Sequence, residues 1–140
     1  MIEKLEARKS SIDRLGCFSK IAITPDSYIA DYEGELISSS EAMRREDDPN
    51  REGVYTFWVD DEYAIDGYAG GNVLKYLNHS CSPNCTYEIR EKRIRIFSLE
   101  EIRPGDELTI DYDYDPDTTL ERCLCGTEKC RGFINNLERA

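Results

Sequence analysis

The chain has little basic charge, a single histidine and no long apolar run. Its 140 residues include 29 acidic and 18 basic side chains, for a formal net charge of −11. A protein that binds a nucleic-acid backbone needs a basic surface to displace counterions, so we expect no direct nucleic-acid binding. The apolar runs are far shorter than the roughly 18 residues needed to cross a bilayer, so no membrane partner is expected. An acidic surface favours a basic protein or peptide as partner.

The first residues lack the apolar core of a secretion signal. Glu3, Lys4 and Glu6 place charges where such a signal is apolar. We therefore expect an intracellular protein, either cytoplasmic or associated with chromatin or a nucleoid, and nuclear in a eukaryote. In a reducing compartment the six cysteines indicate metal ligands or reduced core thiols before they indicate disulfides.

The length suits one folded domain, and the sequence favours strands over helices. β-Branched and aromatic residues gather in short segments that Gly, Pro and Asp separate. Strands are predicted at residues 21–23, 28–32, 54–59, 94–99 and 108–112. Ser38 followed by Glu41 is a capping-box signature, which predicts a short helix to about residue 46, and residues 72–77 allow two further turns. The predicted fold class is α+β and strand-dominated.

Three regions are expected along the chain. Residues 1–11 alternate charges with few apolar side chains and predict a flexible N-terminal arm. Residues 12–117 form the main domain, and residues 118–140 form a cysteine-rich segment.

The cysteine-rich segment predicts a metal site that lacks one ligand. Cys123, Cys125 and Cys130 supply three thiols, whereas a structural Zn²⁺ takes four tetrahedral ligands. A fourth ligand must come from elsewhere in the chain, and four residues are candidates: Cys17, His79, Cys81 and Cys85. The alternative is that the three tail cysteines are unrelated or form a disulfide.

A polar run from Asn78 to Cys85 and the strand at residues 108–112 allow several interpretations. His79 can cap the turn after a short helix, or it can lower the pKa of Cys81 for nucleophilic chemistry. A metal-bound Cys81 cannot serve as that nucleophile. Period-2 alternation puts Tyr112 on the same strand face as Leu108 and Ile110, which favours a core aromatic on pattern alone.

Taken in order, these motifs resemble the SET-domain protein lysine methyltransferases with an attached post-SET zinc segment. The resemblance covers residues from about 13 to 133. The stretches that carry it are Leu15-Gly16-Cys17-Phe18, residues 31–37, Tyr55-Thr56-Phe57, Tyr63-Ala64-Ile65-Asp66, residues 78–85, residues 107–112, and the terminal Cys123, Cys125, Cys130-Arg131-Gly132.

The resemblance implies a SET β-fold with a pseudoknot, in which residues 108–112 thread a loop formed near Asn78. It also implies that a structural zinc joins Cys81 to the three tail cysteines, Cys123, Cys125 and Cys130. Cys85 is then left as a reduced core thiol.

The resemblance further implies an S-adenosylmethionine site. Asn78 would hold the amino-acid end of this cofactor, the backbone at His79 would contact its adenine, and Phe133 would cover it. The full set of implied cofactor contacts is Leu15, Gly16, Cys17, Tyr55, Lys75, Tyr76, Asn78, His79 and Phe133. The sequence departs from the family at Arg14 and Leu15, where a glycine and an aromatic residue are usual, and this changes the cofactor loop.

Three tyrosines are assigned to catalysis by the resemblance. Tyr112 matches the catalytic tyrosine, Tyr32 matches one that lines the lysine channel, and Tyr87 lies where some monomethylating members carry a tyrosine. Methyl transfer to an amine needs a neutral lysine aligned with the donor, and a narrow, poorly solvated aromatic channel favours both. We expect the Tyr87 hydroxyl to favour low methylation states.

The expected function is S-adenosylmethionine-dependent lysine N-methylation of a basic, lysine-bearing tail or loop, on a histone or another basic chromatin-like protein. Five acidic residues are candidates to attract it: Glu33, Glu35, Asp111, Asp113 and Asp115. One alternative is a catalytically weak SET-like module that binds basic peptides by strand addition. Another is a small structural zinc protein.

Overall fold

The computed structural model describes residues 1–51, 55–68, 70–114 and 120–137. In chain order the elements are η1 (Ile2–Lys4), β1 (Leu5–Lys9), β2 (Leu15–Ser19), β3 (Tyr28–Asp31), β4 (Glu35–Ser38), α1 (Ser39–Glu46), β5 (Thr56–Trp58), β6 (Tyr63–Asp66), η2 (Val73–Tyr76), β7 (Asn78–His79), β8 (Cys85–Arg90), β9 (Arg93–Ser98) and β10 (Glu107–Ile110). The strand-dominated α+β class predicted from the sequence is confirmed.

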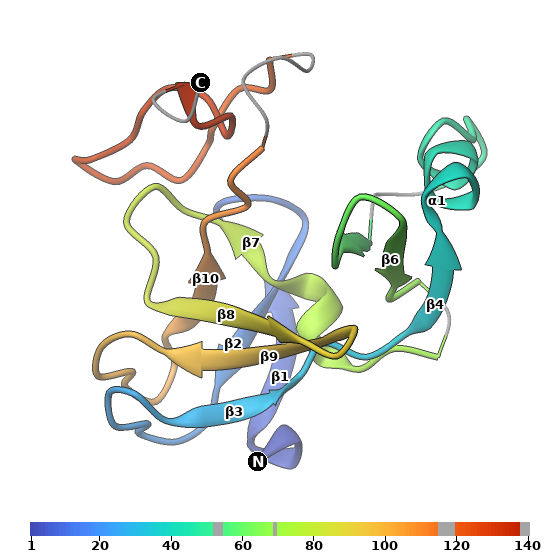
Figure 1. The fold of residues 1–140 in the computed structure, drawn as a ribbon. Coiled ribbons are helices and arrows are strands. Elements are labelled where there is room, and N and C mark those ends of the chain that lie inside the picture. Colours follow the sequence, from blue (N-terminus) through green and yellow to red (C-terminus); the bar gives the residue numbers. More distant parts are fainter. Residues whose placement is uncertain (52–54, 69, 115–119, 138–140) are drawn as a thin grey trace.

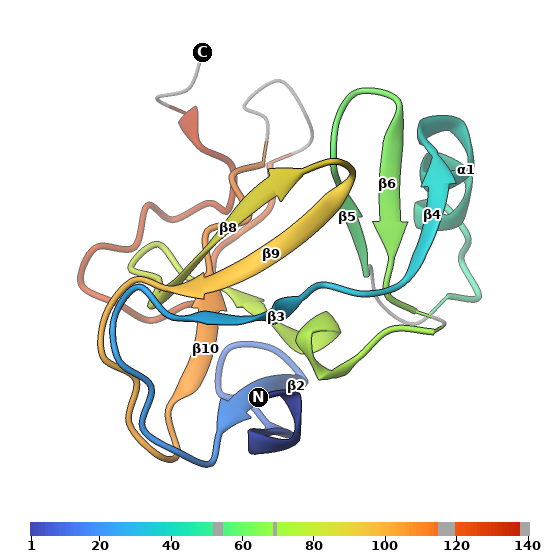
Figure 2. The same ribbon diagram turned by 60° about the horizontal axis from the view of Figure 1, so that its bottom comes forward.

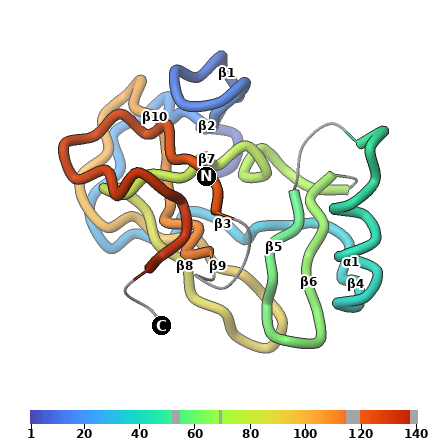
Figure 3. The backbone as a smooth tube through the Cα atoms, turned by 90° about the horizontal axis from the view of Figure 1, so that it is seen from above, coloured from blue at the N-terminus to red at the C-terminus, as the bar shows by residue number. Residues whose placement is uncertain are grey.

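The strands form small sheets arranged around a common core (Figures 1 and 2). One sheet has the order β1-β2-β10-β7, a second has β3-β9-β8, and a third has β4-β6-β5. Helix α1 covers the third sheet, and the C-terminal tail lies on the opposite side of the molecule (Figure 3).

Strand β10 lies between two strands that are distant from it in sequence. It runs antiparallel to β2 and parallel to β7, with Thr109 opposite Asn78 and Ile110 opposite His79. Parallel strands need a long connection, which the chain provides through β8 and β9. This pairing brings the predicted cofactor residues of β7 beside the strand that precedes Tyr112, as the predicted pseudoknot requires.

Aliphatic side chains from all three sheets fill the core. Leu74, Ile94, Ile96, Ile102 and Leu108 are fully buried. A second, smaller cluster of Ile37, Ala42 and Ala64 lies beneath α1. Burying such side chains stabilises a fold by about 1.5–3 kcal/mol each, so this core is the main source of stability for the body of the protein.

The predicted helix after Ser38 is confirmed, the two turns predicted at residues 72–77 are met by one 3₁₀ turn, and both segments begin at a side-chain cap. The Ser38 hydroxyl accepts the N–H of Glu41 at 3.2 Å and begins α1. At residues 72–77 the chain forms the single 3₁₀ turn η2, where Asn72 Oδ1 accepts the N–H of Leu74 at 3.0 Å.

In place of the flexible arm expected at residues 1–11, the chain forms η1 and strand β1. All five residues of β1 pair with β2, and Leu5 is buried in the core. The remaining strand positions are partly or fully exposed because β1 is the edge of its sheet. An edge strand tolerates charged side chains. Because of these charges, the sequence pattern did not predict the strand.

The other predicted strands match in part. Within residues 21–23 only Ile23 forms a bridge, to Ile102. The predicted strand at 54–59 is β5, and residue 54 lies outside the described residues. Among the residues that the structure describes, no helix combines the length and apolarity that crossing a membrane requires.

Candidate functional site

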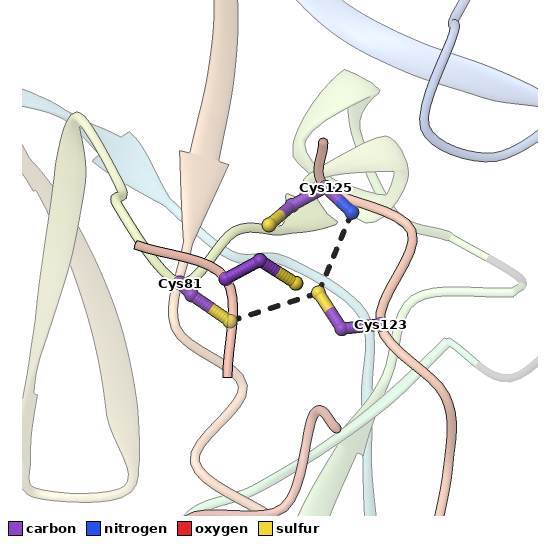
Figure 4. Close-up of side chains that lie close together, drawn as sticks. Cys81, Cys123 and Cys125 are labelled. Carbon is purple, nitrogen blue, oxygen red and sulfur yellow. Dashed lines mark hydrogen bonds between the residues drawn. The ribbon is translucent and has the colours of Figure 1, made fainter. Parts of the chain in front are cut away.

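Four cysteines converge where the tail meets the body. The Sγ atoms of Cys81, Cys123, Cys125 and Cys130 all lie within 4.8 Å of one another. Cys81 follows β7, and the other three belong to the tail. Figure 4 shows the sulfurs of Cys81, Cys123 and Cys125 pointing toward a common centre, with 3.6 Å between those of Cys81 and Cys123.

This donor set fits a tetrahedral zinc ion. Zinc–thiolate bonds of about 2.3 Å place sulfurs roughly 3.8 Å apart, close to the spacing found here. Backbone N–H groups donate to three of the sulfurs, at 3.3 Å from Arg131 to Cys81, 3.4 Å from Cys125 to Cys123 and 3.4 Å from Gly132 to Cys130. Such bonds stabilise thiolates, the form that binds metal. Of the four candidates for the fourth ligand, the structure therefore selects Cys81.

The two remaining cysteines are buried thiols of the core. Cys17 and Cys85 are 0% and 1% exposed, and burial raises the pKa of each thiol to about 12. Both therefore stay protonated at neutral pH and are poor nucleophiles.

Hydrogen bonds and one ion pair hold the tail against the body. Arg131 binds both carboxylate oxygens of Asp111, at 2.7 and 3.1 Å. Phe133, expected to cover the cofactor adenine, is half-buried and forms a bridge with Arg122 inside the tail. Its contact with a cofactor stays a prediction.

His79 connects this cluster to Tyr112. Its Nδ1 accepts the backbone N–H of Tyr112 at 3.0 Å, and its Nε2 lies 3.4 Å from the sulfur of Cys81. Burial lowers the pKa of His79 to about 4 despite the nearby Asp111 carboxylate. The imidazole is therefore neutral, and its 3.6 Å approach to Asp111 is not an ion pair at neutral pH.

The two principal predicted tyrosines have buried phenols bound to main-chain carbonyls. The Tyr112 hydroxyl donates to the carbonyl of Leu77, just before Asn78, and the Tyr32 hydroxyl donates to that of Tyr55 at 2.6 Å. Burial raises the pKa of both phenols well above the ordinary value, and the charges of Tyr114 and Asp66 add to this effect. Neither phenol is a phenolate base at neutral pH.

Aromatic rings extend from Tyr32 to the third predicted tyrosine, Tyr87. Phe57 lies between them, with ring centroids 5.1 Å from Tyr32 and 4.9 Å from Tyr87 in edge-to-face geometry. The rings of Tyr112 and Tyr114 are also in contact, with centroids 5.6 Å apart in a tilted arrangement. Phe57 and Tyr114 received no role from the sequence, although the alternation of Tyr55 with Phe57 placed both on one strand face.

The predicted cofactor residues Tyr55, Lys75 and Tyr76 form one half-buried cluster. The Lys75 ammonium lies 5.8 Å from the Tyr55 ring centroid and 5.2 Å from that of Tyr76, within cation–π range. Tyr68, which sequence reasoning missed, extends the cluster at 5.8 Å from Tyr55, with the Arg51 guanidinium 4.5 Å over its ring.

Asn78 is predicted to hold the amino-acid end of the cofactor. In the structure its side-chain amide nitrogen donates hydrogen bonds to other groups of the protein. The acceptors around Nδ2 are Glu107 Oε2 at 2.8 Å and, each at 3.2 Å, Ser10 Oγ and the carbonyls of Asp13 and Leu15. The Asn78 amide therefore fixes the turn between β1 and β2, the segment expected to contact the cofactor.

Gly16 is constrained by the protein itself. A Cβ atom at this position would lie 2.4 Å from Glu107 Oε2 and 3.1 Å from the Cβ of Ser10. From the sequence, Gly16 was only an implied cofactor contact, and the packing of Glu107 gives an independent reason for a glycine here. Next to it, Leu15 is 42% exposed, and Arg14 has a φ of +31°, a conformation that favours the glycine usual in the family.

Several of the acidic residues proposed to attract a substrate already bind other side chains of the protein. Asp111 is held by Arg131, and Glu35 binds Arg45 at 2.8 Å. Asp113 accepts a hydrogen bond from Asn136 at 3.0 Å, and Asp115 lies outside the described residues. A groove beside Tyr87 is lined by Pro83, Cys85, Thr86, Tyr87, Leu99, Asp111 and Asp113.

The fold and the site together define an α+β protein in which partly or fully buried tyrosines lie beside a four-thiol cluster suited to a metal. The family model described as SET domain matches residues 14–113. The chain therefore belongs to the SET-domain family.

Curated relatives align over nearly the whole chain. The chain is 37% identical over 134 residues to "Histone-lysine N-methyltransferase set-2" of Caenorhabditis elegans, covering 91% of this chain and 9% of that protein. It is 35% identical over 145 residues to "Histone-lysine N-methyltransferase, H3 lysine-4 specific" of Schizosaccharomyces pombe, covering 94% and 16%. It is 36% identical over 140 residues to human "Histone-lysine N-methyltransferase SETD1B", covering 95% and 7%. The chain thus spans less than a fifth of the length of these relatives.

A solved structure shares the fold. The crystal structure of KRYPTONITE in complex with mCHG DNA and SAH superimposes with a TM-score of 0.77 at 28% identity. The match covers 93% of this chain and 28% of that one.

Proposed function

We propose that the protein is an S-adenosylmethionine-dependent protein lysine N-methyltransferase. The observation that carries the proposal is the parallel pairing of β7 with β10. Through this pairing the Tyr112 hydroxyl donates a hydrogen bond to the carbonyl of Leu77, next to Asn78. Relatives whose names describe histone-lysine methyltransferases support it.

The cofactor residues are proposed to act as a polar, aromatic cradle. When bound, S-adenosylmethionine would supply a methyl group on a positively charged sulfur. The rings of Tyr55 and Tyr76 suit its positive charge, and the Lys75 ammonium suits its carboxylate. Asn78 and Glu107 hold the Leu15–Gly16 backbone in place, and Phe133 is proposed to cover the adenine.

The tyrosines are proposed to orient the substrate amine rather than to deprotonate it. Because the Tyr112 and Tyr32 phenols keep their protons and donate them to carbonyls, their oxygen lone pairs face the remaining space as acceptors. A lysine amine held there would lose its proton to water before reaction. Alignment of the amine lone pair with the methyl group then provides the rate advantage.

The direct test is methyl transfer. Purified, zinc-loaded protein with isotope-labelled S-adenosylmethionine should label a lysine of a basic protein, tested with histones and with lysate from the native cell. Binding of the cofactor is measured separately by calorimetry. No binding by folded, zinc-loaded protein would favour the alternative, a SET-like module that captures basic peptides without catalysis.

One substitution tests whether Tyr112 orients the substrate amine without affecting the fold. Tyr112→Phe should lower kcat by about 100-fold, the scale of losing one positioning contact, while leaving cofactor affinity nearly unchanged. Tyr28→Phe removes a hydroxyl from an exposed tyrosine and should leave kcat unchanged. An unaltered kcat in Tyr112→Phe would mean that another group orients the amine.

Tyr87 is proposed to limit the number of methyl groups added. Its ring packs on Phe57 at 4.9 Å, next to Tyr32, which supports a role for its hydroxyl in retaining water near the amine. Tyr87→Phe should raise the fraction of di- and trimethylated product, read by mass spectrometry. Mainly trimethylated product from the unsubstituted protein would contradict this role.

The substrate is proposed to be a basic, histone-like tail. The groove beside Tyr87 carries Asp113 and an Asp111 whose charge Arg131 balances, and the protein as a whole has a net charge of −11. Acidic surfaces speed the approach of basic partners, and the effect weakens with salt. Methylation of basic proteins should therefore slow as ionic strength rises.

A further inference from the structure

The side chain of His79 contacts both the metal ligands and Tyr112. It is 3% exposed and is the only histidine of the chain. Its Nδ1 lies 3.0 Å from the Tyr112 nitrogen, and its Nε2 lies 3.4 Å from Cys81 Sγ. Its ring also packs edge-to-face on the Tyr112 ring, with 5.4 Å between centroids.

The two hydrogen bonds fix where the imidazole proton resides. A backbone N–H only donates, so the nitrogen facing Tyr112 must be an acceptor without a proton. A neutral imidazole then carries its proton on Nε2, which faces the sulfur of Cys81. When Cys81 is a metal-bound thiolate, this N–H···S bond is charge-assisted and stronger than a neutral one.

Asp111 favours the other position of the imidazole proton, on Nδ1 of His79. Asp111 Oδ1 lies 3.6 Å from Nδ1 and would attract a proton there. However, Arg131 already donates to both oxygens of that carboxylate. A proton on Nδ1 would also point at the Tyr112 N–H, so the two arrangements exclude each other.

We propose that His79 is a positioning residue that links the zinc site to Tyr112, with Nε2–H on the Cys81 thiolate and Nδ1 on the Tyr112 N–H. A zinc-bound Cys81 fixes the imidazole, and the imidazole fixes the backbone that carries the catalytic phenol. The link to catalysis rests on the proposed function, whereas the link between metal and backbone does not. This side-chain role is separate from the contact expected between the His79 backbone and adenine.

The unsubstituted protein gives the first test. Because the chain has one histidine, ¹⁵N-histidine labelling yields a single pair of ring nitrogens, and their NMR shifts report which one is protonated. We expect the proton on Nε2, and scalar coupling between it and ¹¹³Cd substituted at the metal site. A proton on Nδ1, or no coupling to cadmium, would overturn the proposal.

Two substitutions then separate the two ends of the link. His79→Asn keeps a polar atom near the Nδ1 position, and His79→Gln keeps one near the Nε2 position. His79→Asn should weaken metal binding by roughly 10- to 100-fold and shift the Co²⁺–thiolate absorption bands to longer wavelength, and at saturating zinc it should lower kcat less than His79→Gln does. His79→Gln should keep the cobalt bands and lower kcat about 10-fold or more at unchanged cofactor KM.

A neighbouring serine supplies the control. Ser82→Ala alters an exposed side chain next to Cys81 and should change neither the cobalt bands nor kcat. Equal loss of both properties in the two His79 variants, or no change in either, would overturn the proposal. If the unsubstituted protein methylates nothing, the cadmium and cobalt measurements still decide whether the link exists.

Discussion

The body and the tail of this protein are held by different forces. The body packs aliphatic side chains from three sheets into a core that includes Leu74, Ile96 and Leu108, all fully buried. Within the part of the tail that the structure describes, residues 120–137, the apolar side chains stay at least partly exposed, and Leu124 is 68% exposed. The tail is held by the cysteine cluster and a few polar contacts. A domain can thus carry a functional segment that its hydrophobic core does not stabilise.

Metal removal should have the largest effect, and this effect should be confined to the tail. Structural zinc sites supply on the order of 10 kcal/mol of folding free energy, and here that energy is concentrated in the tail. A strong chelator, or Cys125→Ser, should loosen the tail backbone so that trypsin cleaves after Arg122, Lys129 and Arg131, and should weaken cofactor binding, while the body stays protected. Mass spectrometry of the digest and calorimetry measure the two effects.

Leu124→Ala is the matched control for the chelation experiment. It changes an exposed side chain between two of the cysteines and should leave the tail protected. Unchanged protease protection and cofactor affinity after verified loss of metal would show that the tail does not need the ion.

A cavity in the core should destabilise the body and leave the metal site of the tail unchanged. Ile96→Ala removes most of a fully buried side chain of β9 and should lower the free energy of unfolding by about 2–5 kcal/mol. The affinity of the cysteine cluster for metal should stay the same in the folded protein. Urea denaturation and metal competition measure these quantities. Ile89→Ala, at a position 39% exposed, should cost much less.

Acid should weaken the body through Asp66. Burial acts to raise the pKa of Asp66, but hydrogen bonds from Arg51, the Tyr68 N–H and Arg45 outweigh it and lower the pKa. A carboxylate with a lowered pKa in the folded state stabilises the fold above its unfolded pKa, and this contribution is lost as pH falls. The free energy of unfolding should therefore decrease as pH falls through about 4, the usual pKa of an Asp in an unfolded chain, and below it.

The acid effect has its own reporter and control. Trp58, the only tryptophan, lies on β5, which pairs with the strand that carries Asp66, so its fluorescence follows this region during denaturation. Asp66→Asn should reduce the slope of stability against pH. Asp26→Asn, which alters an exposed carboxylate in a turn, should leave the slope nearly intact.

The smallest expected effect concerns Arg14. Its φ of +31° is unfavourable for a side chain other than glycine. Arg14→Gly should therefore raise the free energy of unfolding by about 1 kcal/mol or less, because relief of strain is partly offset by the greater freedom of glycine in the unfolded chain. Thermal unfolding measures this, and Asp13→Gly, at the preceding position, should be destabilising.

Local signals in the sequence predicted local structure well. The capping box at Ser38 and Glu41 located the start of α1, because a cap depends on residues that are neighbours in the chain. The edge strand β1 was missed for the opposite reason. Its pairing partner, rather than its own composition, makes it a strand.

Long-range contacts could not be obtained from pattern alone. The residues left the fourth metal ligand open among Cys17, His79, Cys81 and Cys85, and only the family resemblance selected Cys81. The structure assembles the same four-thiol cluster. The packing of Glu107 on Gly16 and Asn78 had no sequence signal, since it depends on how three separate segments meet.

The placement of β10 between β2 and β7 has a consequence for synthesis of the protein on the ribosome. Until residues 107–110 emerge, β2 lacks one neighbour and β7 lacks its partner, so the nascent chain exposes unpaired strand edges that favour aggregation. Closure of the sheet is therefore a late event, after which Cys81 is in place to receive the tail.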